Sequence, residues 1–204
     1  MKRLRIALLS GGKSSEREVS LKSGNEVYSA LDKKKYKVIH YDPAKDLKQL
    51  VLDADRIDFA FIILHGPLGE DGTVQGFFDL LEIPYQGSGV LGSAIAMNKL
   101  VSKKIYEQAE ISTPPYLVIE RNKDVNKQKI VEKIDFPLII KPVSSGSSIG
   151  ISIVKSENAF DKAVKNAFEQ DTKVLLETYI DGVELTCGII GNQKLKALPL
   201  KHKV

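Results

Sequence analysis

Apolar and polar positions alternate in blocks along the first half of the chain, and these blocks predict alternating strands and helices. The strand-like runs are "LRIALLS", "YKVIHY", "DFAFIILH" and a short "IPYQG". Helical patterns fall between them, at about residues 19–31, in "DLKQLVLDA" and in "TVQGFFDLLE". The third strand is almost wholly apolar, as expected for a parallel strand that is covered on both faces. This order predicts an open parallel α/β sheet over residues 1–97.

The pattern changes after about Asn98. "KLVSKKIYEQAE" predicts a helix that "TPPY" ends, and "YLVIE", "FPLIIKP", "GISIVK" and "KVLLETYI" predict strands. Helices are predicted near residues 127–134 and over 156–170, where the second carries an apolar stripe at helical spacing. "GN" at Gly191–Asn192 lies between two apolar runs and predicts a hairpin turn. We therefore expect an α+β domain with hairpins over residues 98–204.

The composition narrows the class of protein. The chain has 204 residues, of which 43% are hydrophobic and 27% charged, as in a soluble globular protein. The net charge of +4 is mild, and the densest basic cluster, "DKKKYK", is typical of a solvated turn, so we expect no nucleic-acid partner. One cysteine excludes an intrachain disulfide, and no apolar run reaches the roughly 18–20 residues that span a bilayer. These features favour a cytoplasmic protein without a membrane partner.

Two loops leave predicted strands at the sheet edge where open α/β proteins bind ligands. "SGGKSSEREVS" contains Ser15 and Glu18 at the spacing of a capping box, so Glu16 there has two interpretations, a helix-start residue or a functional acid. "HGPLGEDGTVQG" contains four glycines, a histidine and two acids. A plain turn needs one or two glycines, so this loop predicts a close approach of a ligand to the backbone.

A third loop, "KPVSSGSSIG", follows an apolar strand that ends at Lys141. Small residues let consecutive backbone N–H groups point into one concavity, and the serine hydroxyls add donors. With the lysine charge, this composition predicts phosphate binding, although the sequence is not a P-loop. Farther on, Glu177 and Glu184 are acids that can accept bonds from an adenine amino group and a ribose, or are solvated residues at strand ends.

The motifs occur in a fixed order: "GGKSSEREVSLKSG", "HGPLGEDGTVQG", "GSGVLGSAIAMNK", "KPVSSGSSIG" and then "ETYIDGVELT". This series resembles the D-alanine–D-alanine ligases of the ATP-grasp superfamily over essentially the whole chain. The resemblance implies an N-terminal α/β domain, followed by the small nucleotide-binding subdomain of an ATP-grasp fold. It also implies a reaction for peptidoglycan precursor synthesis. A D-alanine carboxylate attacks the γ-phosphate of ATP, and a second D-alanine attacks the resulting acyl phosphate.

The resemblance also implies a role for each matching residue. Glu16 would hold the substrate ammonium and Ser147 would share its hydrogen-bonded group, which makes them the catalytic pair. His65, Gly66 and Glu70 would bind the substrate. The residues expected to bind ATP are Lys99, Lys141, Ser145, Gly146, Ser148, Glu177, Ile180 and Glu184. A homodimer is implied as well.

The resemblance departs from the family pattern at two places. The chain stops at Val204, before the family's lid, its oxyanion-stabilising arginine and its Mg²⁺ ligands, so we expect a chain that is incomplete as an enzyme. Thr178 replaces a lysine that many relatives carry beside the nucleotide. The alternatives are a non-catalytic nucleotide-binding fragment and an ATP-grasp ligase for another small amino acid. The choice among D-alanine, D-lactate and D-serine as second substrate depends on the missing part.

Overall fold

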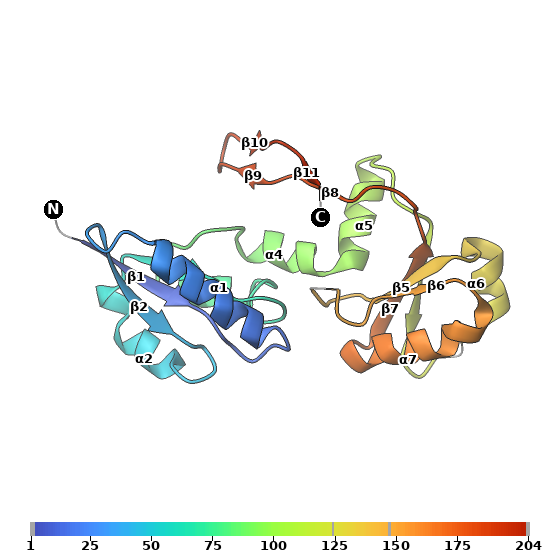
Figure 1. The fold of residues 1–204 in the computed structure, drawn as a ribbon, viewed down its shortest axis with the longest axis horizontal. Helices are drawn as coiled ribbons and strands as arrows, with labels where there is room; N and C mark the ends of the chain where they lie inside the picture. The colour runs from blue at the N-terminus through green and yellow to red at the C-terminus, as the bar shows by residue number, and fades with distance from the viewer. Residues whose placement is uncertain (1–2, 124, 147, 203–204) are drawn as a thin grey trace.

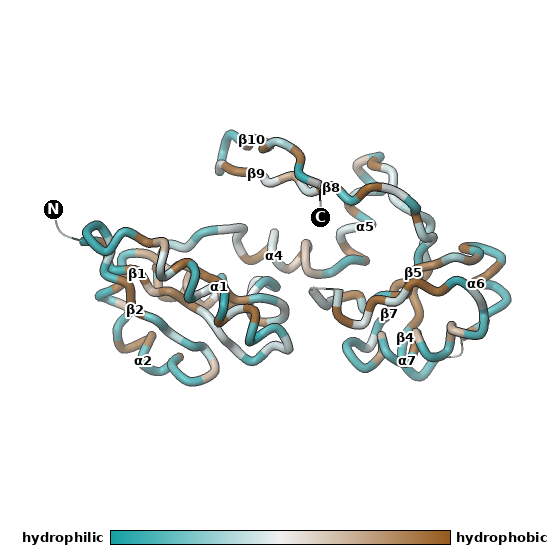
Figure 2. Tube along the Cα trace, in the orientation of Figure 1, coloured by the Kyte–Doolittle hydropathy of each residue, from teal (hydrophilic) through white to brown (hydrophobic). Residues whose placement is uncertain are grey.

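The computed structural model describes residues 3–123, 125–146 and 148–202 of the chain, which form an α/β unit followed by an α+β unit. Ser147, one of the two predicted catalytic residues, lies outside the described residues. In Figure 1 the two sheets lie at opposite ends of the molecule, with helices α4 and α5 between them. Figure 2 shows apolar residues concentrated along the strands of both sheets, with polar residues on the outer loops.

The first unit is a parallel three-stranded sheet of order β2-β1-β3, flanked by helices. Its elements are β1 (Leu4–Leu9), α1 (Arg17–Ala30), β2 (Tyr36–Tyr41), α2 (Leu47–Leu52), η1 (Ala54–Arg56), β3 (Phe59–Ile62) and α3 (Thr73–Leu80). Ala7 and Leu9 on the central strand are fully buried, in one cluster with Leu50 and Phe78 from the helices. The central strand β1 is buried on both faces, as its continuous apolar run predicts, whereas β2 keeps exposed positions.

The predicted fourth strand of this sheet is wrong. "IPYQG" contributes only an isolated parallel bridge between Ala60 and Tyr85. Beyond it, the Gln86 side chain takes the place of a strand backbone: its Oε1 accepts from Ile62 N at 2.9 Å and its Nε2 donates to Ile62 O at 2.6 Å. The amide side chain satisfies one residue of the β3 edge, so no further ladder is needed there.

Two helices connect the units. α4 (Val90–Met97) was not predicted, because its two small residues Gly92 and Ser93 and its short length give a weak helical pattern. α5 (Lys99–Gln108) begins where expected, with the Asn98 side chain accepting from Val101 N at 3.0 Å. Lys99 N also donates to Val143 O at 3.0 Å, so the start of α5 is attached to the loop after β5.

The second unit is a four-stranded antiparallel sheet of order β4-β7-β5-β6. Its elements are β4 (Tyr116–Glu120), α6 (Lys127–Ile134), β5 (Leu138–Pro142), β6 (Ser152–Val154), η2 (Glu157–Ala159), α7 (Phe160–Gln170) and β7 (Lys173–Thr178). The predicted stripe on α7 faces the sheet: Phe160, Ala163 and Ala167 are buried in one cluster with Leu138 and Leu176. The predicted α+β arrangement is confirmed.

The chain then continues through two short antiparallel pairs above α4 in Figure 1. β9 (Ile189–Ile190) pairs with β10 (Lys196–Ala197) across a turn that contains Gly191 at a φ of +109°, so the predicted hairpin is present. β8 (Leu185–Thr186) pairs with β11 (Lys201–His202). Among the described residues, none of the helices combines the length and the apolar character that crossing a bilayer requires.

Candidate active site

The loops that follow β1 and β3 are tied together by serines of α1 and of the first loop. Ser20 Oγ donates to Ile63 O and accepts from Gly11 N at 2.8 Å. Ser14 Oγ donates to His65 O at 2.8 Å. The carboxyl ends of the two neighbouring strands are therefore fixed against the start of α1, at the edge where a parallel sheet binds ligands.

Glu16 lies at the centre of this edge and is 3% exposed. A Cβ atom added to Gly66 would lie 2.6 Å from Glu16 Oε1, and one added to Gly146 would lie 3.1 Å from the same oxygen. Two glycines from loops far apart in the sequence thus flank one buried carboxylate. A side chain at Gly66 would force the Glu16 carboxylate to move, and one at Gly146 would press against it.

The capping-box interpretation of this segment is wrong. α1 begins at Arg17 with Glu16 as its N-cap residue, and no side chain of the described residues makes the N-cap hydrogen bond. Ser15 is exposed and one position too early. The loop is braced instead by Arg17, which donates to Gly12 O at 2.7 Å and pairs with Asp42. The hydrogen bond from Arg17 is the main cause that holds the pKa of Asp42 well below its usual range.

The acids of the glycine-rich loop brace its backbone. Glu70 Oε2 accepts from Gly66 N at 2.7 Å, and Asp71 accepts from Leu68 N at 2.8 Å and from Thr73 N at 3.0 Å. Burial would raise the pKa of Asp71, but these backbone hydrogen bonds outweigh it and lower the pKa. The loop is thereby held rigid around Gly66, which keeps a positive φ of 72°.

Two buried polar atoms in and beside the glycine-rich loop have no hydrogen-bond partner among the described residues. They are His65 Nε2 and Gln75 Oε1. Gln75 Nε2 donates to Gly69 O at 3.0 Å, which fixes the orientation of its amide. Both residues line a cavity of about 670 Å³ that also contacts Lys99 and Gly146. Buried polar atoms normally have a hydrogen-bond partner, so these two atoms are candidates for contact with a ligand in that cavity.

The serine- and glycine-rich loop reaches this cavity from the second unit. Lys99 Nζ donates to Ser145 O, and Ile149 N donates to Gly146 O at 3.2 Å. Ser148 adopts a left-handed φ of 60°, which is uncommon for a residue with a side chain. These contacts hold Ser145 and Gly146 beside Glu16 on one side and Lys99 on the other.

Lysines converge on one glutamate in the adjoining cavity of about 440 Å³. Glu177 Oε1 pairs with Lys141, and Glu177 Oε2 lies 3.0 Å from Lys103 Nζ. Lys99 lines the same cavity, and burial and then the charge of Lys141 lower its pKa. Three lysines around one carboxylate leave an excess of positive charge, which favours an anionic ligand.

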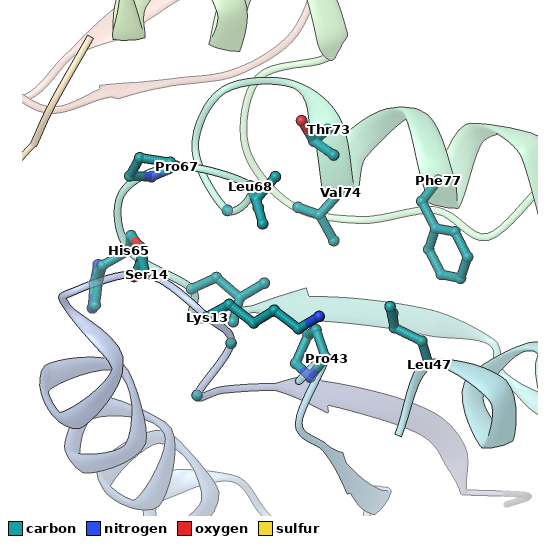
Figure 3. A pocket seen from close by; sticks show the side chains of 14 residues that line it. Lys13, Ser14, Pro43, Leu47, His65, Pro67, Leu68, Thr73, Val74 and Phe77 are labelled. Atoms are coloured by element: carbon teal, nitrogen blue, oxygen red, sulfur yellow. Dashed lines mark hydrogen bonds between the residues drawn. The ribbon is translucent and has the colours of Figure 1, made fainter. Parts of the chain in front are cut away.

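A third cavity, of about 200 Å³, lies between the glycine-rich loop and α2 (Figure 3). Its lining is mainly apolar, with Leu47, Leu68, Val74 and Phe77, and the Lys13 side chain runs along it toward Pro43. It shares Leu64, His65 and Gly69 with the larger cavity. Lys13 is the only charged side chain in its lining among the described residues, so the chemistry points to the other two cavities.

Comparison with known proteins agrees with this arrangement. The family model "D-ala D-ala ligase N-terminus" matches residues 5–53 and 46–88, and "D-ala D-ala ligase C-terminus" matches residues 105–204. The D-alanine–D-alanine ligase of Syntrophobacter fumaroxidans is 51% identical over 97% of this chain and 64% of its own length. The crystal structure of VanG D-Ala:D-Ser ligase from Enterococcus faecalis has a TM-score of 0.82 at 31% identity, over 98% of this chain and 70% of that chain.

The chain belongs to the D-alanine–D-alanine ligase family. The ligase from Bacillus anthracis, solved in complex with ATP, has a TM-score of 0.84 at 39% identity, over 98% of this chain and 65% of that chain. The family and the fold class expected from the motifs are confirmed. The chain spans 62–65% of the lengths of the curated relatives it matches.

The structure brings some of the predicted site residues together and leaves others apart. Glu16, Gly66, Glu70 and Gly146 meet at one point, and Lys99, Lys141 and Glu177 meet at the next. Two of the predicted ATP-binding residues, Ile180 and Glu184, follow β7 and are exposed. Neither is among the described residues that line the cavity around Glu177. The roles and the domain boundary at residue 97 stay predictions.

Sequence reasoning missed Lys103, which is 7% exposed and pairs with Glu177. The available signal was its position four residues after Lys99, which places both lysines on one face of α5.

Proposed function

We propose that this chain supplies the substrate-side domain and part of the ATP-binding domain of a D-alanine–D-alanine ligase. The enzyme would join two D-alanines through an acyl phosphate, for peptidoglycan precursor synthesis. The observation that carries the proposal is the meeting of opposite charges at one loop. Ser145 and Gly146 lie between the buried carboxylate of Glu16 and the lysines around Glu177.

The acidic side of this loop suits a small amino acid. The Glu16 carboxyl group is buried between Gly66 and Gly146, where it would accept a charge-assisted hydrogen bond from a substrate ammonium. The backbone at both glycines comes close to the carboxylate, which suits a small ligand. His65 Nε2 and Glu70 lie on the same cavity wall and would orient the substrate. Ser147 would complete the group, as the family pattern implies.

The basic side suits a nucleoside triphosphate. Lys99 and Lys141 would contact the phosphates, together with the backbone and hydroxyl donors of Ser145, Gly146 and Ser148. Glu177 would accept from the adenine amino group, and Ile180 and Glu184 would contact the base and the ribose. The excess of positive charge around Glu177 supports this assignment, as does the ATP complex of the Bacillus anthracis relative.

Magnesium is the cofactor that the family pattern implies. Within the described ranges, no group of three or more histidine, cysteine, aspartate or glutamate side chains is placed to hold a metal ion. These residues therefore do not fit a magnesium site, and we assign none to them. A homodimer belongs to the same proposal.

The test uses a chimera in which residues 1–204 are continued by the remaining C-terminal residues of the Syntrophobacter fumaroxidans relative. With ATP, Mg²⁺ and D-alanine, we expect ADP, phosphate and D-alanyl-D-alanine from the chimera. We expect no dipeptide from the 204-residue chain alone. A folded chimera that forms no dipeptide, while the intact relative does, would contradict the proposal.

A second amino-acid specificity has a specific observation in its favour, because the similar VanG structure is that of a D-Ala:D-Ser ligase. The chimera is therefore assayed with D-serine and D-lactate beside D-alanine. A chain that binds ATP but remains inactive in every chimera would instead be a non-catalytic nucleotide-binding fragment.

A further inference from the structure

Lys103 is a buried cation that none of the predicted roles uses. It lies on α5, one turn after Lys99, and is 7% exposed. Its Nζ is 3.0 Å from Glu177 Oε2 and 4.8 Å from the ring centroid of Tyr116. A charged lysine is rarely buried to this degree unless it is paired, so its place beside Glu177 calls for an explanation.

The surroundings of Lys103 are themselves fixed. Tyr116 lies directly opposite Glu177 in the β4–β7 register, and the Tyr116 hydroxyl donates to Glu107 Oε2 at 3.1 Å. Glu107 is on α5, four residues after Lys103, so the helix and the strand hold the ring from both sides. The ammonium of Lys103 therefore stays between the aromatic face and the carboxylate.

Glu177 is consequently held at both oxygens. Lys141 pairs with Oε1 and Lys103 with Oε2, and the Glu177 side chain is 9% exposed. An ionised carboxylate has about four acceptor sites, so two ion pairs leave acceptors for a ligand. With one partner on each oxygen, rotation of the carboxylate would break an ion pair in a buried setting, which is costly. The remaining acceptors thus keep one direction relative to the cavity.

We propose that Lys103 is a positioning residue that fixes the Glu177 carboxylate and thereby selects the nucleotide base. This inference rests on the proposed function, in which the cavity around Glu177 holds the base of ATP. A fixed acceptor favours a purine with an amino donor at C6, as in adenine. It disfavours a purine with an oxygen at C6, because two acceptors then face each other without a proton.

The test compares ATP with inosine triphosphate, which carries oxygen in place of the C6 amino group. Affinities of the 204-residue chain for both nucleotides are measured by calorimetry for the wild type, Lys103→Met, Lys103→Arg and Lys104→Met. Lys104 is the exposed neighbour on the same helix and serves as the matched control. The measured quantity is the ratio of the two affinities.

We expect the wild type to prefer ATP by about tenfold or more, as for a hydrogen bond to a charged group. Lys103→Met should reduce this preference to about threefold or less, Lys103→Arg should retain most of it, and Lys104→Met should leave it unchanged. If Lys103→Met lowers both affinities equally, Lys103 is only structural and the inference is overturned. Should Lys103→Met fold poorly, Lys103→Gln takes its place, because it also removes the charge of Lys103. The same reduced preference for ATP is expected.

The outcomes separate this inference from the function on which it rests. A wild type that binds both nucleotides equally would overturn the selection by Glu177 and Lys103, while the nucleotide site would stand. A wild type that binds neither nucleotide would contradict the nucleotide site itself, and the inference with it.

Discussion

The two sheets of this chain present their candidate ligand-binding groups in opposite ways. The parallel sheet β2-β1-β3 uses loops at its carboxyl edge, and the charge it offers there is the buried carboxylate of Glu16. The antiparallel sheet β4-β7-β5-β6 uses side chains rooted in regular elements, with Lys141 on β5, Glu177 on β7 and Lys103 on α5. The candidate site at the parallel sheet is formed mainly by loop backbone and glycines. The candidate site at the antiparallel sheet is formed mainly by long charged side chains.

This difference assigns a separate task to each unit. A loop with glycines can surround a small ligand closely, because the backbone itself forms the wall. A sheet face with several lysines can hold a larger anion, because long side chains reach it from several strands. The Ser145–Gly146 segment contacts both sites, so the two ligands would meet there. The predictions below test how independent the two units are.

The largest expected effect tests whether the units have separate cores. Phe78 on α3 is fully buried in the first cluster, and that cluster shares no residue with the second. Phe78→Ala should cost about 3–5 kcal/mol of unfolding free energy, through lost burial and the cavity left behind. Hydrogen exchange should then show lost protection in β1–β3 while β5 and β7 keep theirs.

Leu80→Ala is the matched control for this experiment, because Leu80 lies on the same helix and is 86% exposed. Equal loss of protection in both sheets after Phe78→Ala would show that the units unfold as one, and the comparison would fail.

The second prediction tests the acidic side. In the chimera, Glu16→Gln should lower kcat/KM for D-alanine by about 10- to 100-fold, which corresponds to about 1.5–3 kcal/mol for a charge-assisted contact. Binding of ATP should change little, because Glu16 does not line the lysine cavity. Steady-state kinetics and a thermal melt on the same variant distinguish a substrate-binding role of Glu16 from a purely structural one. An unchanged kcat/KM with only a lower melting temperature would remove Glu16 from the substrate site.

Much of this comparison was predictable from the sequence, where local patterns and tertiary demands agree. The helix at Lys127–Ile134 and the strands around Lys141 follow from apolar periodicity, because their apolar faces pack on the sheet as the pattern requires. The glycine-rich loop was predicted to admit a ligand close to its backbone, and this stays a prediction. The structure shows instead that the side chain of Glu16, fifty residues earlier in the chain, lies close to Gly66.

Most of the failures share a physical cause, which is a contact distant in sequence that replaces a local one. The helix α4 is the exception, because its own local pattern is weak. The Gln86 side chain satisfies Ile62 where a strand was expected. The contacts of Arg17 and Ser14 organise the start of α1 where a capping box was expected. Lys103 was missed because its significance comes from Glu177, which lies on β7. Such pairings have no signature in a local window.

A smaller effect on kcat/KM should distinguish a glycine beside Glu16 from a glycine that has open space around it. Gly66 and Gly87 both have positive φ, at 72° and 97°, so alanine at either position costs about 1–2 kcal/mol. An alanine Cβ at Gly66 would also meet Glu16 Oε1 at 2.6 Å, whereas one at Gly87 meets nothing within 4 Å. Both variants should lower the melting temperature of the chimera. Only Gly66→Ala should strongly lower kcat/KM for D-alanine, with at most a small decrease for Gly87→Ala. Equal kinetic losses would mean that contact with Glu16 is not the reason for Gly66.

The smallest expected effect concerns the basic side and depends on pH. Burial, and then the charge of Lys141, lower the pKa of Lys99 in the free chain. Only the protonated ammonium attracts phosphate, so ATP affinity should be highest below the pKa of Lys99 and should fall as the pH rises through it.

The decrease in ATP affinity should begin at lower pH than for an ordinary lysine, whose pKa is about 10.4. Calorimetry from about pH 8 to 10, where ATP itself keeps its charge, should show a decrease of up to about tenfold per pH unit for one proton. Lys99→Met should bind ATP more weakly at pH 8 and should lose this decrease of affinity with rising pH. Lys104→Met should keep it. A wild-type profile that falls no more steeply than that of Lys99→Met would show that Lys99 does not contact the phosphates through its charge.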